Sequence, residues 1–190
     1  MTPIVYAGDS VLRAVAAPVP LSMFGTRQLK SLVEEMVAVM RAAPGVGLAA
    51  PQIGIGWRVI VVEDDDESMA HLSEAERLER GRVRLPLTAI INPVLRRIGD
   101  ADETFVEGCL SVPGYGAQVA RAREVEVDGL TVDGAPLKLR LAGWPARILQ
   151  HECDHLAGTL YIDRMISRTF AIVRPAREKP ESPAEPAPQK

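Results

Sequence analysis

The chain has 190 residues, with 25 acidic against 22 basic side chains and 47% hydrophobic residues. This length can bury a core of single-domain size, and the near balance of charge leaves no sign of a direct nucleic-acid-binding surface. No apolar run is long enough to cross a membrane and the N-terminus lacks a secretory signal pattern, so we expect a cytoplasmic protein without a membrane partner.

The first predicted element is a helix at residues 26–42, because apolar side chains recur there at helical spacing and Pro44-Gly45 ends the pattern. Extended segments are predicted at residues 57–62, 89–94, 124–132 and 136–141. Asp133-Gly134 predicts a hairpin turn between the last two segments.

An acidic insert at residues 63–82 separates the first two extended segments. Ser73 and Glu76 predict a capping box for a short helix within it, and we expect the insert to be a solvated excursion. Residues 174–190 are rich in Pro, Glu and Ala and cannot bury enough apolar surface to order themselves. We therefore expect a catalytic domain at residues 1–173 and a disordered tail at residues 174–190.

The most informative stretch is His151-Glu152-Cys153-Asp154-His155, on a helix predicted at residues 145–157. Because a helix turns about 100° per residue, His151 and His155 share one face and Glu152 lies beside them. Two imidazoles and a carboxylate in this arrangement suit a metal site that activates water. We expect an α+β fold with small antiparallel sheets packed around this central metal-binding helix.

A water-activating metal site usually has a third protein ligand, and the chain's two cysteines are the candidates. Cys153 lies about 160° from His155 on the helix and is predicted to pack with Leu149 and Leu156 in the core. Cys109 stands in a glycine-containing segment beyond a strand, where a thiolate is easily presented. We expect Cys109 and the two histidines to hold one ion with an open position, which favours a reducing compartment.

Residues 45–50 match the dinucleotide-binding pattern GxGxxA, which needs a preceding strand and a following helix. A predicted helix precedes them and Pro51 follows, so a nucleotide site is disfavoured. The plain alternative is a turn that ends the helix. We favour a glycine-permitted loop that approaches the metal and directs Gln52 to the substrate.

The sequence resembles the peptide deformylases, most closely their organelle-related and bacterial type 1 branch. The family motifs GxGLAAxQ, EGCLS and QHExDH stand in order at residues 45–52, 107–111 and 150–155, and residues 3–13 and 143–170 are also similar. The resemblance covers residues 3–173. It implies removal of the formyl group from the initiator methionine of new chains, with Fe²⁺ in the cell, Zn²⁺ common after purification, and transient ribosome contact.

Hydrolysis of an amide needs a nucleophile, a proton carrier and donors for the oxyanion. We assign proton transfer to Glu152, and the resemblance assigns the oxyanion to the side chain of Gln52 and the backbone N–H of Leu110, with Gly47 permitting close approach. The expected substrate-binding residues, which would enclose a methionine side chain, are Gly45, Val46, Trp144 and Ile148. Trp144 is equally compatible with a plain core aromatic.

One position departs from the family pattern. Many bacterial members carry an arginine seven residues after the metal-binding cysteine, where this chain has Gly116. The protein either does without that cation or uses another one such as Arg121 or Arg123. Two nearby carboxylates, Glu107 and Asp154, are predicted to orient metal ligands, and the alternative for either is a surface ion pair.

Two other functions compete with deformylation. An HExxH endopeptidase is disfavoured because Cys109 and Gln52 have no place in that motif. A non-enzymatic binding module stabilised by metal is disfavoured because Glu152 and Gln52 are both intact.

Overall fold

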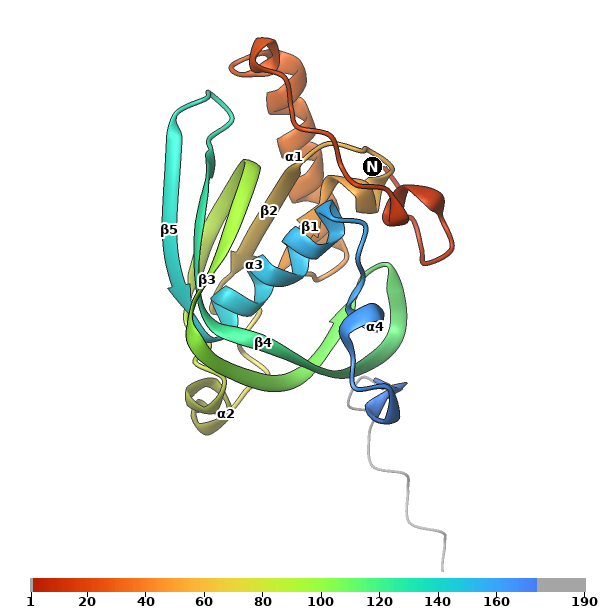
Figure 1. The fold of residues 1–190 in the computed structure, drawn as a ribbon, viewed down its shortest axis with the longest axis vertical. Coiled ribbons are helices and arrows are strands. Elements are labelled where there is room, and N and C mark those ends of the chain that lie inside the picture. The colour runs from red at the N-terminus through yellow and green to blue at the C-terminus, as the bar shows by residue number, and fades with distance from the viewer. Residues whose placement is uncertain (1, 174–190) are drawn as a thin grey trace, which may run out of the picture.

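The computed structural model describes residues 2–173 and has helix α3 (Gly143–Leu156) at its centre, with the sheet curving around it (Figure 1). The predicted tail at residues 174–190 lies outside the described residues. The helix prediction at residues 145–157 is confirmed, with the start two residues earlier. The α+β fold class is confirmed as well.

Across the described residues, six strands form one antiparallel sheet with the order β1-β2-β3-β4-β5, and β6 pairs with β4. The strands are β1 Gly47–Ala49, β2 Val59–Asp64, β3 Leu85–Cys109, β4 Val112–Leu130, β5 Pro136–Ala142 and β6 Ala171–Ile172. The small sheets that we expected are therefore joined into one continuous, bent sheet. The predicted turn at Asp133-Gly134 connects β4 to β5, and Gly134 has the positive φ of 87° that such a turn favours.

The long hairpin of β3 and β4 was only partly predicted. Apolar patterning predicts two short strands at residues 89–94 and 124–132, whereas β3 has 25 residues and β4 has 19. The polar stretch in the middle of β3 lacks apolar alternation but is paired with β4 in the backbone ladder, and cross-strand ion pairs such as Arg96 with Glu126, 3.0 Å apart, lie beside that pairing. The hairpin bends around α3 (Figure 1), and its strand pairing shifts register between Ile98 and Asp102, an irregularity of the kind that bends strands.

Helix α1 (Arg27–Ala42) confirms the first predicted element. Thr26 caps it, because its side chain accepts a hydrogen bond from the backbone N–H of Leu29 at 3.3 Å. Two short helices, α2 (Glu74–Glu79) and α4 (Tyr161–Arg164), complete the α-helices of the described residues. Single 3-10 turns lie at Ser10–Arg13, Leu21–Met23, Ala50–Ile53 and Ser167–Thr169. No helix in this part of the chain is long and apolar enough to span a membrane.

One face of helix α3 packs into the hydrophobic core, and the other carries the two histidines. Ala146, Leu149 and Leu156 are buried in a hydrophobic cluster with side chains of the sheet. Cys153 packs against the same cluster, as predicted, and burial raises the pKa of its thiol to about 12. Since the core holds one face of α3, the histidines on the other face are held in a fixed position.

The acidic insert is largely exposed, as expected, but it is also anchored to the rest of the domain, which the sequence did not predict. Its first and last parts are joined by a buried ion pair, in which Arg82 Nε lies 2.7 Å from Asp64 Oδ2. Met69 and Leu72 are also buried. The predicted capping box forms, with reciprocal hydrogen bonds between Ser73 and Glu76 at the start of α2.

Candidate metal centre and substrate pocket

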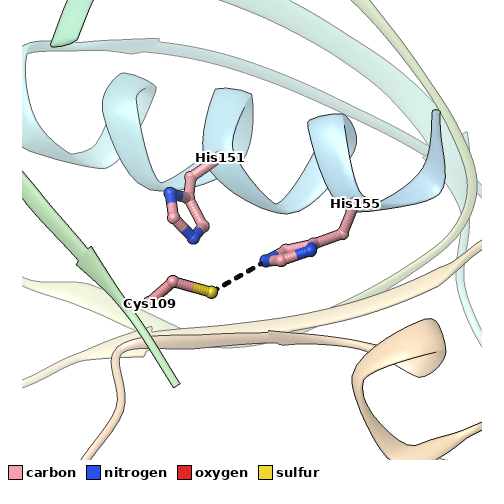
Figure 2. Close-up of side chains that lie close together, drawn as sticks. All are labelled: Cys109, His151 and His155. Atoms are coloured by element: carbon pink, nitrogen blue, oxygen red, sulfur yellow. Dashed lines mark hydrogen bonds between the residues drawn. The ribbon is translucent and has the colours of Figure 1, made fainter. Parts of the chain in front are cut away.

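Three potential metal ligands meet between α3 and the end of β3. The ligand atoms of Cys109, His151 and His155 all lie within 4.8 Å of one another. Figure 2 shows the two imidazoles projecting from α3 toward the cysteine, and Cys109 Sγ lies 3.4 Å from His155 Nε2. The pairing of β3 with β4 shifts register between Gly108 and Cys109, the last two residues of β3. This irregularity lies at the strand end that carries the Cys109 thiol.

This geometry fits a divalent ion. With metal–nitrogen bonds of about 2.0 Å and a metal–sulfur bond of about 2.3 Å, tetrahedral ligand atoms are about 3.5 Å apart. The observed sulfur–nitrogen separation of 3.4 Å agrees with that value. One thiolate and two imidazoles are a donor set that suits zinc or ferrous iron, and three protein ligands leave one coordination position for water or substrate.

Glu107 orients the first histidine. Its Oε2 lies 3.0 Å from His151 Nδ1, so the Nδ1–H donates to the carboxylate and Nε2 is free to serve as a ligand. Burial alone would raise the pKa of Glu107, but hydrogen bonds from Arg121 and His151 outweigh burial and hold the pKa well below its usual value. Glu107 is thus a buried carboxylate beside a ligand and not a surface ion pair.

Asp154 is also buried, but it contacts neither histidine directly. It accepts hydrogen bonds from Arg121 Nη1 at 2.5 Å and Arg164 Nε at 2.6 Å. Arg121 in turn donates to Glu107 at 2.9 Å, which ties Asp154 to the ligand-orienting carboxylate. This network is the physical link between the two carboxylates and His151.

The two arginines suggested as substitutes for the family arginine do not serve that role. Arg121 is 5% exposed and fully engaged with carboxylates, and Arg123 is exposed and lies 3.3 Å from Glu103. Neither residue lines the pocket beside the candidate ligands. The suggestion is therefore wrong.

Glu152 is enclosed beside the ligands. Burial raises its pKa to about 7, and within the described residues its Oε2 has no hydrogen-bond partner. A side chain at Gly47 would place its Cβ only 2.8 Å from Glu152 Cδ, so strand β1 can lie against the carboxyl group only because this residue is glycine. A carboxyl group with a near-neutral pKa is well suited to transfer protons.

Gln52 is held by the 3-10 turn that follows β1. Its Oε1 accepts a hydrogen bond from the backbone N–H of Ala49 at 2.9 Å. Its Nε2 consequently faces the metal ligands and donates to Ser111 Oγ at 3.3 Å and Cys109 Sγ at 3.6 Å. Ser111 belongs to the motif at residues 107–111, but the sequence assigns it no role, because its contact with Gln52 depends on the fold of the turn after Cys109.

A cavity of about 700 Å³ opens beside these groups. His155 does not line it and is 1% exposed. The other expected metal-ligand, catalytic and substrate-binding residues all line the cavity: Gly45, Val46, Gly47, Gln52, Cys109, Leu110, Trp144, Ile148, His151 and Glu152. The chain segments that carry the three motifs thus meet around one space, although they are far apart in sequence.

Trp144 combines the two roles that the sequence left open. It packs against the core cluster and also lines the cavity beside Ile148. Gly45 and Leu110 also line the cavity and lie close together, since a Cβ at Gly45 would lie 2.8 Å from Leu110 Cδ1. The cavity therefore has an apolar section next to the candidate metal centre.

The structure accounts for Gly116. A Cβ there would lie 2.9 Å from the backbone oxygen of Glu107 and 2.5 Å from Val173 Cγ2. The C-terminal strand β6 pairs with β4 at this position, with Ala171 opposite Gly116. A larger side chain at this position would therefore collide with the Val173 side chain and with the backbone of β3, and Val173 itself lines the cavity.

A cation that the sequence analysis missed lies on another wall. Arg80, from the insert, lines the cavity, and its guanidinium lies 5.4 Å from the centroid of the Trp144 ring. No periodicity or motif distinguishes Arg80 from the other basic residues of the insert. Only the docking of the insert against the start of α3 reveals it.

In an α+β domain, a sheet cysteine beside the two histidines of an HExxH helix is a ligand set typical of the class of metal-dependent hydrolases. A family model described as polypeptide deformylase matches residues 1–171. The chain belongs to the peptide deformylase family, which confirms the resemblance found in the sequence.

Individual relatives agree. The chain is 50% identical over 173 residues to peptide deformylase 1A, chloroplastic, of Solanum lycopersicum, covering 91% of this chain and 62% of that protein. It is 47% identical to peptide deformylase 1 of Streptomyces coelicolor, covering 89% of this chain and 75% of the relative. The chain thus spans less than two thirds of the tomato protein.

A solved structure shares the fold. The Met-Ala-Ser-bound class I type b peptide deformylase from Acinetobacter baumannii superposes with a TM-score of 0.76 at 34% identity, covering 87% of this chain and 100% of that one. The agreement extends over nearly all of the described residues. The fold around the candidate metal centre is therefore that of a peptide deformylase.

Proposed function

We propose that this protein hydrolyses the N-formyl group from the N-terminal formylmethionine of newly synthesised polypeptides and releases formate. The observation that carries the proposal is the convergence of the ligand group with Glu152 and Gln52 around one cavity. Family membership and the Met-Ala-Ser peptide bound to the Acinetobacter relative support it.

In the proposed mechanism, Cys109, His151 and His155 would hold one divalent ion, which would supply a Lewis acid and a nucleophile at neutral pH. Glu152 takes a proton from the attacking water and delivers it to the methionine nitrogen as the C–N bond breaks. Gln52 Nε2 and the backbone N–H of Leu110 donate to the formyl oxygen as negative charge develops on it. Formate and a free amine are the products.

The same proposal assigns the methionine side chain to the apolar section of the cavity. Val46, Trp144 and Ile148 would contact the thioether chain, and Gly45 would allow the substrate backbone to pass close to β1. Formyl peptides that begin with a polar residue should therefore be poor substrates. Measuring kcat/KM for formyl-Met and formyl-Ser peptides would test this assignment.

We propose Fe²⁺ as the metal in the cell, with Zn²⁺ as the ion often found after purification. The sulfur and imidazole donors support either metal, and availability of the ion decides between them. Anaerobic purification followed by elemental analysis, with turnover measured for each reloaded form, would test the choice. A native preparation that holds zinc and gains no activity with iron would contradict it.

The decisive experiment is formate release from formyl-Met-Ala-Ser by metal-loaded protein, with acetyl-Met-Ala-Ser and unformylated Met-Ala-Ser as controls. Deformylation predicts formate from the first peptide only. Internal cleavage of unformylated peptides would favour the endopeptidase alternative. Full metal occupancy without formate or cleavage would favour the binding module and contradict the proposal.

We further propose that residues 1–173 are the catalytic unit, with nascent chains as substrates and transient contact with the ribosome. The proposed compartment is the cytoplasm, and because the tomato relative is named chloroplastic, an organelle is the alternative. Cell fractionation would distinguish these compartments. Equal kcat/KM of the full chain and a chain ending at Val173 is the result expected for the catalytic unit.

A further inference from the structure

Some charged side chains that line the cavity have hydrogen-bond partners and others do not. Besides Glu152, the lining contains the charged residues Glu107, Arg147 and Arg80. Arg147 is 4% exposed and donates to Glu107 at 2.6 Å and to the backbone oxygen of Val119 at 2.9 Å, so both members of that pair are engaged. Arg80 is partly exposed and, among the described residues, makes no side-chain hydrogen bond or ion pair.

Arg80 is nevertheless held in place. Its guanidinium lies 5.4 Å from the centroid of the Trp144 ring, a favourable cation–π distance. Two residues further along, the buried Arg82–Asp64 pair anchors the insert, and the backbone N–H of Trp144 donates to Gly81 at 3.3 Å. The positive charge is therefore fixed at the cavity wall before any ligand arrives, which lowers the cost of binding one.

We call the part of the cavity wall formed by Arg80, Val106, Tyr115 and Val173 the outer cavity, and it contains no carboxylate. Glu76, four residues before Arg80, interacts with its charge but is exposed and does not line the cavity. Val106, Tyr115 and Val173 line it with mainly apolar surface. A guanidinium beside apolar walls is less screened than one on an open surface, and its fork of N–H donors matches a carboxylate. The ligand that fits is an anionic group on a chain already held by its methionine.

We propose that Arg80 is a specificity-determining residue that binds a carboxylate side chain in the first two residues after formylmethionine. The enzyme then favours nascent chains with an acidic residue near the start. This inference rests on the proposed deformylase function, because the peptide has to be seated by its methionine beside the metal centre. The acidic insert would then contribute to substrate specificity, because it places the Arg80 guanidinium at the cavity wall.

The test compares kcat/KM for formyl-Met-Asp-Ser with formyl-Met-Asn-Ser, and formyl-Met-Ala-Asp with formyl-Met-Ala-Asn. We expect an Asp-over-Asn preference of roughly 3–10-fold in at least one pair, as for a partly screened charge-assisted contact. Arg80→Gln should abolish the preference while changing kcat/KM for the Asn peptides less than about 2-fold. Arg80→Lys should retain part of it. Arg84→Gln, an exposed arginine outside the cavity, is the matched control and should retain all of it.

A second measurement separates this inference from the proposed function. Affinities of the metal-loaded protein for the unformylated peptides Met-Asp-Ser and Met-Asn-Ser need no turnover and should show the same Arg80-dependent preference. Absence of formate with this preference intact would contradict deformylation alone. Deformylation in which wild type and Arg80→Gln have the same Asp-to-Asn ratio would overturn the role of Arg80 alone.

Discussion

The charged side chains at the metal centre are paired with one another, whereas the charged side chain of the outer cavity is not. At the centre, Glu107, Arg121 and Asp154 are buried and joined to one another by hydrogen bonds, so the charges that orient His151 are neutralised within the fold. In the outer cavity, Arg80 stacks on Trp144 and, among the described residues, makes no ion pair; the exposed Glu76, four residues earlier, interacts with its charge without contacting it at hydrogen-bond distance. Changes at the centre should therefore affect turnover or stability, whereas changes at the outer wall should affect peptide choice.

The largest effect is expected at Glu152. Glu152→Ala should leave the metal bound and lower turnover by at least the ~10²–10⁴-fold typical of a lost general acid–base group. Metal content and kcat are measured on the same sample. Cys153→Ala, the neighbouring residue that packs into the core, is the matched control and should keep near-normal turnover. Near-normal turnover of Glu152→Ala would remove this carboxyl from the mechanism.

The next effect is expected at Gln52. Gln52→Leu removes an oxyanion donor and should lower kcat by roughly 10²–10³-fold while the metal stays bound. Steady-state kinetics on formyl-Met-Ala-Ser would separate kcat from KM. A rise in KM with kcat unchanged would show instead that Gln52 only positions the substrate.

The buried network is tested by Arg121→Met. This change leaves Glu107 and Asp154 without their shared partner, and breaking a buried pair costs about 3–5 kcal/mol. The free energy of unfolding by urea measures the loss. The control is Arg123→Met on the exposed side of the same strand, which should change stability by only about 0.5 kcal/mol. Equal effects of the two changes would show that the network adds no stability.

Acid should lower the free energy of unfolding through protonation of Glu107. Because the pKa of Glu107 is lower in the folded protein than in the unfolded chain, Glu107 contributes stability above the unfolded pKa of about 4.3 and loses it as pH falls further. Below about pH 4, the unfolding free energy of wild type should fall more steeply than that of Glu107→Gln, by up to about 1.4 kcal/mol per pH unit. Parallel pH profiles would contradict this.

The smallest effect is expected in the insert. Ser73→Ala removes the N-cap of α2 and should cost about 1 kcal/mol locally, with turnover of neutral peptides unchanged. Proteolytic cleavage within residues 63–82 and kcat are the two readouts. Faster cleavage with normal kcat would support the separation between centre and outer wall. A fall in kcat would show that the insert supports the chemistry itself.

The motifs were predictable because their information is local. HExxH places two histidines on one helical face in any context, and rotation about the helix axis was enough to exclude Cys153 as a ligand. The helix at residues 26–42 followed from apolar periodicity in the same way. The extent of β3 did not, since Arg96 and its neighbours are paired by charge across strands rather than marked by apolar alternation.

Residue order alone was enough to specify the family, the ligand set to be expected and the helix that carries it, because these depend on residue types at short, fixed spacings. The sequence also predicted a ligand-orienting role for Glu107 and a close approach at Gly47, but only the folded chain shows their partners, His151 and Glu152. The position of Arg80 at the cavity was not predicted at all. Each of these contacts joins segments far apart in the chain. Their geometry comes from the bend of the sheet around α3 and the docking of the insert, which no local pattern encodes.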